Sequence, residues 1–342
     1  MPEIWRKDRL YAFLRPYVDA CTRNSYCCVK CDGALPRDGA VIIAPNHTNT
    51  LMDALVILQS RRDRTVFASR ADIFRKPMVA RILRFLKIVP MARSRDTREE
   101  IAHNRDVLLE IDDTLAHGVP FCIFAEGTHR PKHSLLPIRK GVARVALDSA
   151  ARRQTYIVPA GIDYSDWFHY RGKVKLKYGD PINVTSLMLE HQGLSGKDMY
   201  GVIQEELHKR LSQLILYFPD DENYDAALKE WEDAHRRPGW LRVLRILLAV
   251  LLSPLFLLSA VLTLPMWAGA EYLCRNKIKD RAFRNTARYG FKLIGTPLML
   301  VIWGVVFGLL IGLWPWWLCL ALWCWVFHSY SFFYDWLNLL RK

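Results

Sequence analysis

The stretch that decides the fold reads Val41-Ile-Ile-Ala-Pro-Asn-His-Thr-Asn-Thr-Leu-Met-Asp53. Its apolar, β-branched start predicts a buried strand over residues 41–44, which Pro45 ends. A helical pattern follows over residues 50–59. In α/β folds, ligands bind where strands end and helices begin. The polar residues between this strand and this helix are therefore candidate active-site residues.

Strands and helices alternate over the rest of the first two-thirds of the chain. Further strands are predicted over residues 66–68, 88–91, 121–124, 156–159 and 173–178. Further helices are predicted over residues 77–86, 97–117 and 196–214, and one more begins near residues 137–141. This alternation predicts an α/β fold with a mainly parallel central sheet flanked by helices.

Charge and hydropathy divide the chain into two regions. The whole chain has a net charge of +14, and residues 241–342 hold 11 Lys and Arg against 3 Asp and Glu. The same region holds 25 uncharged residues over 246–270, and a 42-residue run over 293–334 in which only His328 is ionisable. Runs of this length can enter a bilayer. We therefore expect an α-helical, membrane-embedded C-terminal region.

The predicted organisation has four parts. Residues 1–30 form an amphipathic helix, which lies on a membrane surface or packs on the domain. Residues 31–217 form the catalytic domain, and residues 218–245 a polar, then basic connector. In residues 246–342, segment 246–270 is re-entrant or transmembrane, and segment 293–334 is a transmembrane hairpin.

Basic segments beside apolar runs favour anionic membrane lipids as partners, and no nucleic-acid motif is present. No signal peptide is expected, so the body should face the cytoplasm, at the bacterial inner membrane. Cys28-x-x-Cys31 has the spacing of a metal or redox pair but lacks a second pair, and no metal site is predicted.

His47 and Asp53 are the candidate catalytic residues. A His that accepts a proton, oriented by a carboxylate, is sufficient to deprotonate an alcohol. The chain has no Gly-x-Ser-x-Gly motif, so the attacking oxygen should belong to the substrate. A His followed by an Asp at the start of a solvated helix is the structural alternative.

A second polar motif, Glu126-Gly127-Thr128-His129-Arg130, follows the strand over residues 121–124. Gly127 allows backbone N–H groups to approach an anion, and Lys140 lies at the predicted start of a helix, where phosphate is favoured. Glu126 acting as a helix cap is the alternative.

Two further motifs lie on strands. Val89-Pro-Met-Ala-Arg93 places a guanidinium just after a strand, where it could bind phosphate or pair with a surface acid. Val158-Pro159-Ala-Gly-Ile162 is an apolar strand suited to the wall of an acyl pocket, and an edge strand is the alternative reading of Pro159.

These four motifs, in this order over roughly residues 30–190, resemble the phospholipid/glycerol acyltransferase superfamily, which includes 1-acyl-glycerol-3-phosphate and glycerol-3-phosphate acyltransferases. The resemblance implies that His47 is the general base and Asp53 its partner. It implies that Arg93, Glu126, Gly127 and Thr128 bind the glycerol phosphate, with Arg130 and Lys140 as further candidates. The acyl donor would be acyl-CoA or acyl carrier protein, with no cofactor.

Two departures from the family pattern bear on the site. Five residues separate His47 from Asp53, where four are usual, so the added residue must lie in the turn before the helix if the two side chains are to meet. The longer spacing resembles the glycerol-3-phosphate or dihydroxyacetone-phosphate subgroup. Ala125 and His129 replace the usual Pro and Arg.

The expected function is transfer of a fatty acyl group to the hydroxyl of 1-acyl-sn-glycerol 3-phosphate in phospholipid biosynthesis. Glycerol 3-phosphate or dihydroxyacetone phosphate is the alternative acceptor. A lipid thioesterase or hydrolase, and a non-catalytic membrane scaffold, are the remoter alternatives.

Overall fold

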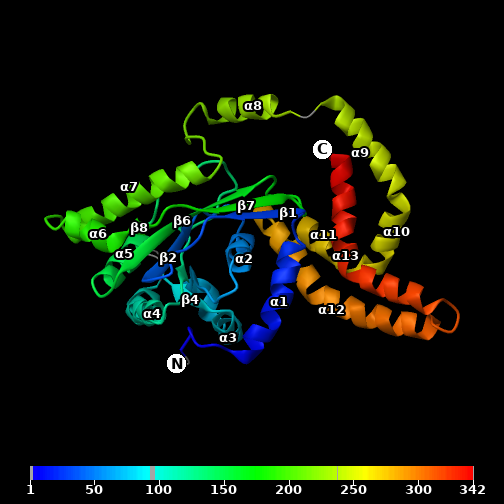
Figure 1. Ribbon diagram of the computed structural model, residues 1–342, viewed down its shortest axis with the longest axis horizontal. Helices are drawn as coiled ribbons and strands as arrows, with labels where there is room; N and C mark the ends of the chain where they lie inside the picture. Colours follow the sequence, from blue (N-terminus) through cyan, green and yellow to red (C-terminus); the bar gives the residue numbers. More distant parts are fainter. Residues whose placement is uncertain (1–2, 93–96, 237, 342) are drawn as a thin grey trace.

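The computed structural model describes residues 3–92, 97–236 and 238–341. Within these residues, eight strands form one sheet in the order β1-β7-β6-β2-β5-β3-β4, with β8 also paired to β6 (Figure 1). The strands are β1 (Cys28–Asp32), β2 (Ala40–Pro45), β3 (Val66–Arg70), β4 (Ile88–Met91), β5 (Phe121–Cys122), β6 (Thr155–Tyr164), β7 (Lys173–Tyr178) and β8 (Ile182–Asn183).

Most pairings in the sheet are parallel. Strand β2 lies between β5 and β6 and is parallel to both, and β3 is parallel to β4 and β5. Only the pairings of β6 with β7 and with β8 are antiparallel in the described chain. The predicted α/β fold with a mainly parallel sheet is confirmed. The short strands β1 and β8 were not predicted.

Helices cover both faces of the sheet. They are α1 (Arg9–Arg23), α2 (Leu51–Gln59), α3 (Pro77–Phe85), α4 (Arg98–Ala116), α5 (Lys140–Ala150), α6 (Val184–Glu190), α7 (Gly196–Leu214) and α8 (Tyr224–Ala234), with a 3₁₀ turn η1 (Ala71–Arg75) after β3. Successive side chains of β2 point to opposite faces, as the period of a strand requires. Ile42 packs with the core beneath α4, α5 and α7, whereas Ile43 packs with the core beneath α2.

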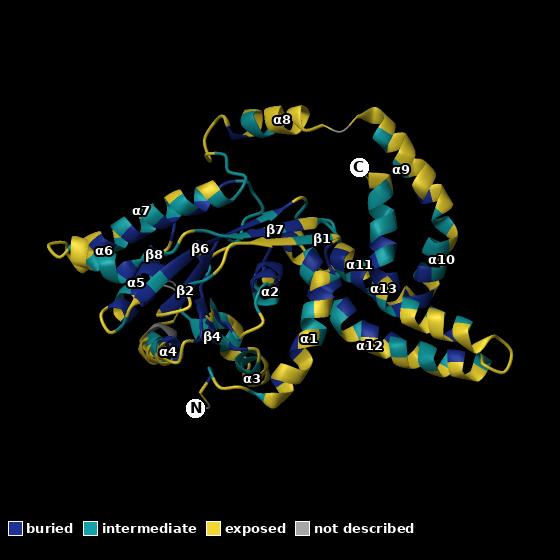
Figure 2. Ribbon diagram, viewed as in Figure 1, coloured by how far each residue is buried: buried dark blue, intermediate teal, exposed yellow. Residues whose placement is uncertain are grey.

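The C-terminal region is helical throughout its described length. It comprises α9 (Gly239–Leu251), α10 (Ser253–Leu262), α11 (Leu264–Asn276), the 3₁₀ turn η2 (Arg281–Phe283), α12 (Arg284–Leu310) and α13 (Trp316–Arg341). Helices α12 and α13 form a hairpin whose far end is exposed (Figure 2). Buried residues of α12 and α13, such as Tyr289 and Tyr330, share one core with α2.

One described helical stretch, residues 281–310, is long and apolar enough to cross a membrane, and it contains an 18-residue window with a mean hydropathy of 2.3. Helices α9 and α10 meet at a 58° bend and would supply a second span if they act as one. The bend lies next to Pro254, in the segment predicted to be re-entrant. Insertion of these helices into a bilayer remains a prediction.

Helix α1 packs on the domain through one face and exposes the other. The buried guanidinium of Arg15 donates to the carbonyl oxygens of Leu58 and Arg61, the latter at 2.7 Å, and its Nε donates to Asp19 at 2.8 Å. Arg15 therefore ties α1 to carbonyl groups in and just after the last turn of α2, where the Leu58 oxygen also accepts from the N–H of Arg61 at 3.2 Å. The exposed face carries Phe13, so packing on the domain does not exclude contact with a membrane.

Replacing Arg15 by Met should lower the free energy of unfolding by about 3 kcal/mol, because it removes the guanidinium donors to the Leu58 and Arg61 carbonyl oxygens and to the Asp19 carboxylate. Denaturant unfolding of the purified protein in detergent measures this change. Arg9→Met, at an exposed position of the same helix, is the matched control and should be nearly neutral. Equal stability of the two variants would contradict this role of Arg15.

Candidate active site

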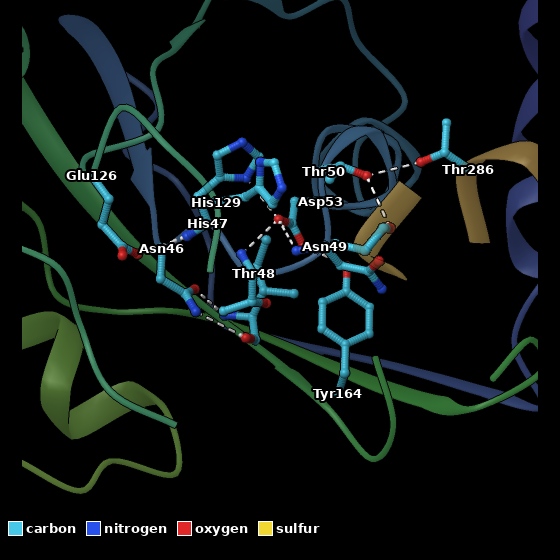
Figure 3. A network of polar contacts seen from close by, with 12 residues as sticks. Asn46, His47, Thr48, Asn49, Thr50, Asp53, Glu126, His129, Tyr164 and Thr286 are labelled. Atoms are coloured by element: carbon cyan, nitrogen blue, oxygen red, sulfur yellow. Dashed lines mark hydrogen bonds and ion pairs between the residues drawn. The ribbon is translucent and has the colours of Figure 1, made fainter. Parts of the chain in front are cut away.

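The candidate site lies where β2 ends and α2 begins (Figure 3). Nδ1 of His47 lies 2.8 Å from Oδ2 of Asp53, so the predicted pair is in direct contact. Asp53 is in the first turn of α2 and is fully buried, whereas the side chain of His47 is 17% exposed. The imidazole is therefore held from inside the protein.

The Asp53 carboxylate accepts four hydrogen bonds. Besides His47, the backbone N–H groups of Thr48 and Asn49 donate to Oδ2, at 2.9 and 2.7 Å. The Tyr164 hydroxyl donates to Oδ1 at 2.7 Å. Burial, reinforced by the Asp53 charge, raises the pKa of Tyr164 well above its usual value, so the phenol stays protonated and can donate. Four donors compensate for burying this carboxylate.

The residue added to the usual family spacing lies in the turn before α2. Thr50 precedes the helix and has a φ of 50°, a conformation that a β-branched residue rarely adopts. Asp53, in the first turn of the helix, therefore faces His47. On one continuous helix the six positions from His47 to Asp53 would turn about 600° and separate the two side chains. The sequence left open whether Asp53 contacts His47 directly, and the structure shows that it does.

The imidazole of His47 is placed to act on a substrate. Its ring stacks on Phe124, with 4.1 Å between centroids. With Nδ1 directed to Asp53, the other ring nitrogen, Nε2, makes no hydrogen bond within the described chain. A carboxylate at Nδ1 favours the tautomer in which Nε2 carries a free lone pair. The role of His47 as the general base remains a prediction.

Glu126 is buried and holds backbone groups. Its Oε1 accepts from the N–H of His47 at 2.8 Å, and its Oε2 accepts from the N–H of Leu136 at 2.9 Å. Burial raises the pKa of Glu126 to about 6, against the lowering effect of these two N–H groups. The carboxyl group thus fixes the backbone of His47, and a direct contact with substrate remains a prediction.

The loop after Glu126 is exposed. Gly127 has a φ of 67°, and a Cβ added there would lie 3.1 Å from Cγ of Arg139, so glycine fits both the backbone and the contact. Thr128 and Lys140 are also exposed. Arg139, which the sequence did not single out as a site residue, donates from its Nε to the Glu126 carbonyl oxygen at 3.4 Å.

The other predicted phosphate-binding residues differ in their surroundings. Arg130 is paired with Asp220 and donates to the Ser134 hydroxyl at 2.7 Å, so its guanidinium already has partners. Arg93 lies outside the described residues. Their roles toward phosphate remain predictions.

Pro159 lies in β6, next to Ala44 of β2, and is buried inside the sheet. Because β6 lies between β2 and β7, the edge-strand reading of Pro159 is wrong.

The side chain of Asn46 connects the turn after β2 to β6, a contact that the sequence did not predict. Its Oδ1 accepts from the N–H of Ile162 at 2.7 Å, and its Nδ2 donates to the carbonyl oxygen of Ile162 at 3.1 Å. These two bonds tie residues 46–50, which contain the candidate catalytic His47 and are called the catalytic turn below, to β6. Strand β6 also supplies Tyr164.

The structure shows an α/β domain with a His–Asp pair where β2 ends and α2 begins, and comparison with known proteins indicates an enzyme. Residues 28–163 match the family model described as Acyltransferase, and this segment is an acyltransferase domain. The resemblance drawn from the four motifs is thereby confirmed over these residues.

The chain is similar in sequence to two curated proteins of Saccharomyces cerevisiae. It is 28% identical to glycerol-3-phosphate O-acyltransferase 1 over 113 residues, 32% of this chain and 15% of that protein. It is 42% identical to glycerol-3-phosphate O-acyltransferase 2 over 65 residues, 18% of this chain and 9% of that protein. The matches thus span less than a sixth of either relative.

Among solved structures, the chain is similar to the crystal structure of the 1-acyl-sn-glycerophosphate acyltransferase PlsC from Thermotoga maritima. The TM-score is 0.42 at 21% identity, and the match covers 61% of this chain and 84% of that one.

The pKa of Glu126 predicts a pH dependence of stability. Because the folded-state pKa, about 6, is above the ordinary value of 4.5, the folded state binds the proton more tightly. This stabilisation is present below pH 4.5 and is lost as the pH rises through 6. The difference corresponds to roughly 2 kcal/mol. Relative to Glu126→Gln, the wild type should therefore lose about 2 kcal/mol of unfolding free energy between pH 4 and pH 7. Parallel pH curves for the two proteins would contradict this reading.

Proposed function

We propose that this protein is an O-acyltransferase that moves a fatty acyl group from a thioester donor to a hydroxyl of a glycerol-phosphate acceptor. The observation that carries the proposal is the contact between His47 and the buried Asp53, with Nε2 of His47 left for the substrate. The acyltransferase match over residues 28–163 supports the same reaction class.

In the proposed reaction, Nε2 of His47 removes the proton from the acceptor hydroxyl as its oxygen attacks the thioester carbonyl carbon. A tetrahedral intermediate forms, and its oxyanion is stabilised by backbone N–H groups. The carbon–sulfur bond then breaks, and the thiolate takes the proton from the His47 imidazolium. Asp53 stabilises that imidazolium throughout. The step is balanced without a covalent enzyme intermediate or a cofactor.

The proposed phosphate site is the exposed loop at Gly127 and Thr128 with the start of α5. Arg139, just before this helix, lies against Gly127, so the loop, one cation and the helix N-terminus meet at one surface, and Lys140 is the first residue of the helix. Such a surface favours a phosphate dianion. Arg93 and Arg130 remain further candidates for the same phosphate.

Two acceptors are supported by different observations. Glycerol 3-phosphate is supported by the names of the two yeast relatives and by the five-residue spacing between His47 and Asp53. The acceptor 1-acyl-sn-glycerol 3-phosphate is supported by the position of α12. This apolar helix begins beside the catalytic turn, where Thr286 bonds Thr50. A lipid acceptor carried along α12 would reach His47 directly.

The proposed location is the cytoplasmic face of a membrane, the inner membrane in a bacterial cell, with acyl-CoA or acyl carrier protein as the donor. Helix α12 and the exposed apolar residues of α1 support contact with membrane lipids. A thioesterase or hydrolase would use His47 to activate water instead. A non-catalytic scaffold would have no need for an imidazole that a buried carboxylate orients while its Nε2 is left free.

His47→Ala should abolish acyl transfer, and Asp53→Asn should lower kcat by about 10²–10⁴, because the base is lost or loses its orienting charge. Radiolabelled acyl transfer by the purified full-length protein measures both. His235→Ala, at the exposed end of α8, is the matched control and should keep wild-type kcat. Turnover by His47→Ala at the wild-type rate would reject the assignment.

An acceptor and donor panel identifies the substrate. Labelled acyl-CoA and acyl carrier protein are each offered with glycerol 3-phosphate, dihydroxyacetone phosphate, 1-acyl-sn-glycerol 3-phosphate or no acceptor, and products are identified by mass. We expect an acylated glycerol phosphate and little free fatty acid without acceptor. Free fatty acid released equally with and without acceptor would instead indicate a hydrolase.

A further inference from the structure

The start of the C-terminal helical region lies on the catalytic turn. The hydroxyl oxygens of Thr50 and Thr286 are 2.9 Å apart, and the Thr50 hydroxyl also lies 3.5 Å from the Ala282 carbonyl oxygen (Figure 3). Thr50 lies in the turn between His47 and Asp53, and Thr286 is in the first turn of α12. These contacts join positions more than 230 residues apart in the sequence.

Thr50 needs such a contact because its backbone is strained. A β-branched residue with φ near 50° and ψ near −126° costs about 1–3 kcal/mol and persists only when its surroundings hold it. Thr50 is buried, and the described partners of its side chain all come from residues 282–286. The C-terminal region thus holds the turn that sets the distance between His47 and Asp53.

The same segment also contacts the other side of the site. Oδ2 of Asp280 lies 2.9 Å from Nε2 of His129, which follows the Glu126–Thr128 loop. The ring of His129 packs edge-on between His47 and Phe283, with centroid distances of 5.8 and 5.3 Å. Asp280 therefore orients a second imidazole against the ring of the proposed base.

Neighbouring contacts fix this segment to the rest of the C-terminal region. Arg288, two residues after Thr286, is buried and pairs with Glu271 of α11 at 2.8 Å. Its carbonyl oxygen accepts from the Tyr330 hydroxyl of α13 at 3.0 Å. The start of α12 is thus held by α11 and α13 while it contacts the catalytic turn.

We propose that residues 280–286 form a positioning clamp for the active site: Thr286 holds the catalytic turn through Thr50, and Asp280 holds His129 against His47. This segment lies outside the acyltransferase match, which ends at residue 163. The C-terminal region is therefore part of the catalytic apparatus as well as a candidate membrane anchor. The kinetic side of this proposal rests on the proposed acyltransferase function.

The kinetic test uses Thr286→Val, which removes the hydroxyl at nearly constant volume, in the full-length protein. We expect kcat to fall 10- to 100-fold with the KM of the acyl donor within twofold of wild type, because the base loses its position and the donor site is untouched. Thr286→Ser, which restores the hydroxyl, should recover most of kcat. Asp280→Asn should lower kcat about 10-fold.

Two matched controls separate the clamp from general helix packing. Thr296→Val makes the same change at a buried site about 15 Å further along α12. Asp233→Asn makes the same change at an exposed site in α8. Both should keep wild-type kcat. If Thr286→Val keeps the wild-type kcat, or if Thr296→Val lowers kcat as much as Thr286→Val does, the clamp proposal is overturned.

A second test of the clamp does not depend on enzymatic activity. It measures amide hydrogen exchange of residues 46–53 in the detergent-solubilised protein. Exchange there should be faster in Thr286→Val and Asp280→Asn than in wild type, and unchanged in Thr296→Val. Unchanged exchange in both clamp variants overturns the proposal. If the wild-type protein transfers no acyl group, the proposed function is rejected but the clamp is not. The hydrogen-exchange measurement then tests the clamp. If Thr286→Val does not fold, Asp280→Asn carries both measurements.

Discussion

The site depends on one buried negative charge. Burying a carboxylate without partners would cost several kcal/mol, so the chain must bring donors to Asp53 if it is to fold around an ionised group. Its four donors come from the turn after β2, from His47 and from the end of β6. The hydrogen bonds that stabilise the Asp53 carboxylate therefore also fix the turn after β2, the end of β6 and the imidazole of His47.

A second buried carboxyl group works on the other side of His47. Glu126 accepts from the His47 backbone N–H, while Asp53 faces the His47 ring. The backbone of Arg130 in turn donates to the His47 carbonyl oxygen at 3.0 Å. The imidazole is thus held through its ring, its N–H and its carbonyl, which leaves Nε2 as the free atom. In the proposed reaction, such pre-organisation would let the neutral imidazole act as a base without rearrangement.

The sequence predicted what is local and periodic. The strand at residues 41–44, the helix after it and the polar turn between them follow from alternation and a Pro, and the structure has them at 40–45 and 51–59. The resemblance carried by the four motifs also implied that Glu126 and His47 belong to one site, and Glu126 does contact the His47 backbone. The sequence could not give the partner of Tyr164, which depends on strand order, or the pairing of His129 with Asp280, 151 residues away. An acid within a basic segment gives no local sign that it meets the site. The five-residue spacing predicted an unusual turn, but only the structure identified Thr50 as its strained residue.

The proposed chemistry requires that Asp53 fixes His47 with the proton on Nδ1 and a lone pair on Nε2. Nitrogen-15 NMR of the imidazoles in the full-length protein, with the His47 signals assigned by difference from His47→Gln, reports this tautomer. At a pH where His47 is neutral, we expect a protonated Nδ1 and an unprotonated Nε2. A neutral His47 that carries its proton on Nε2 would contradict it.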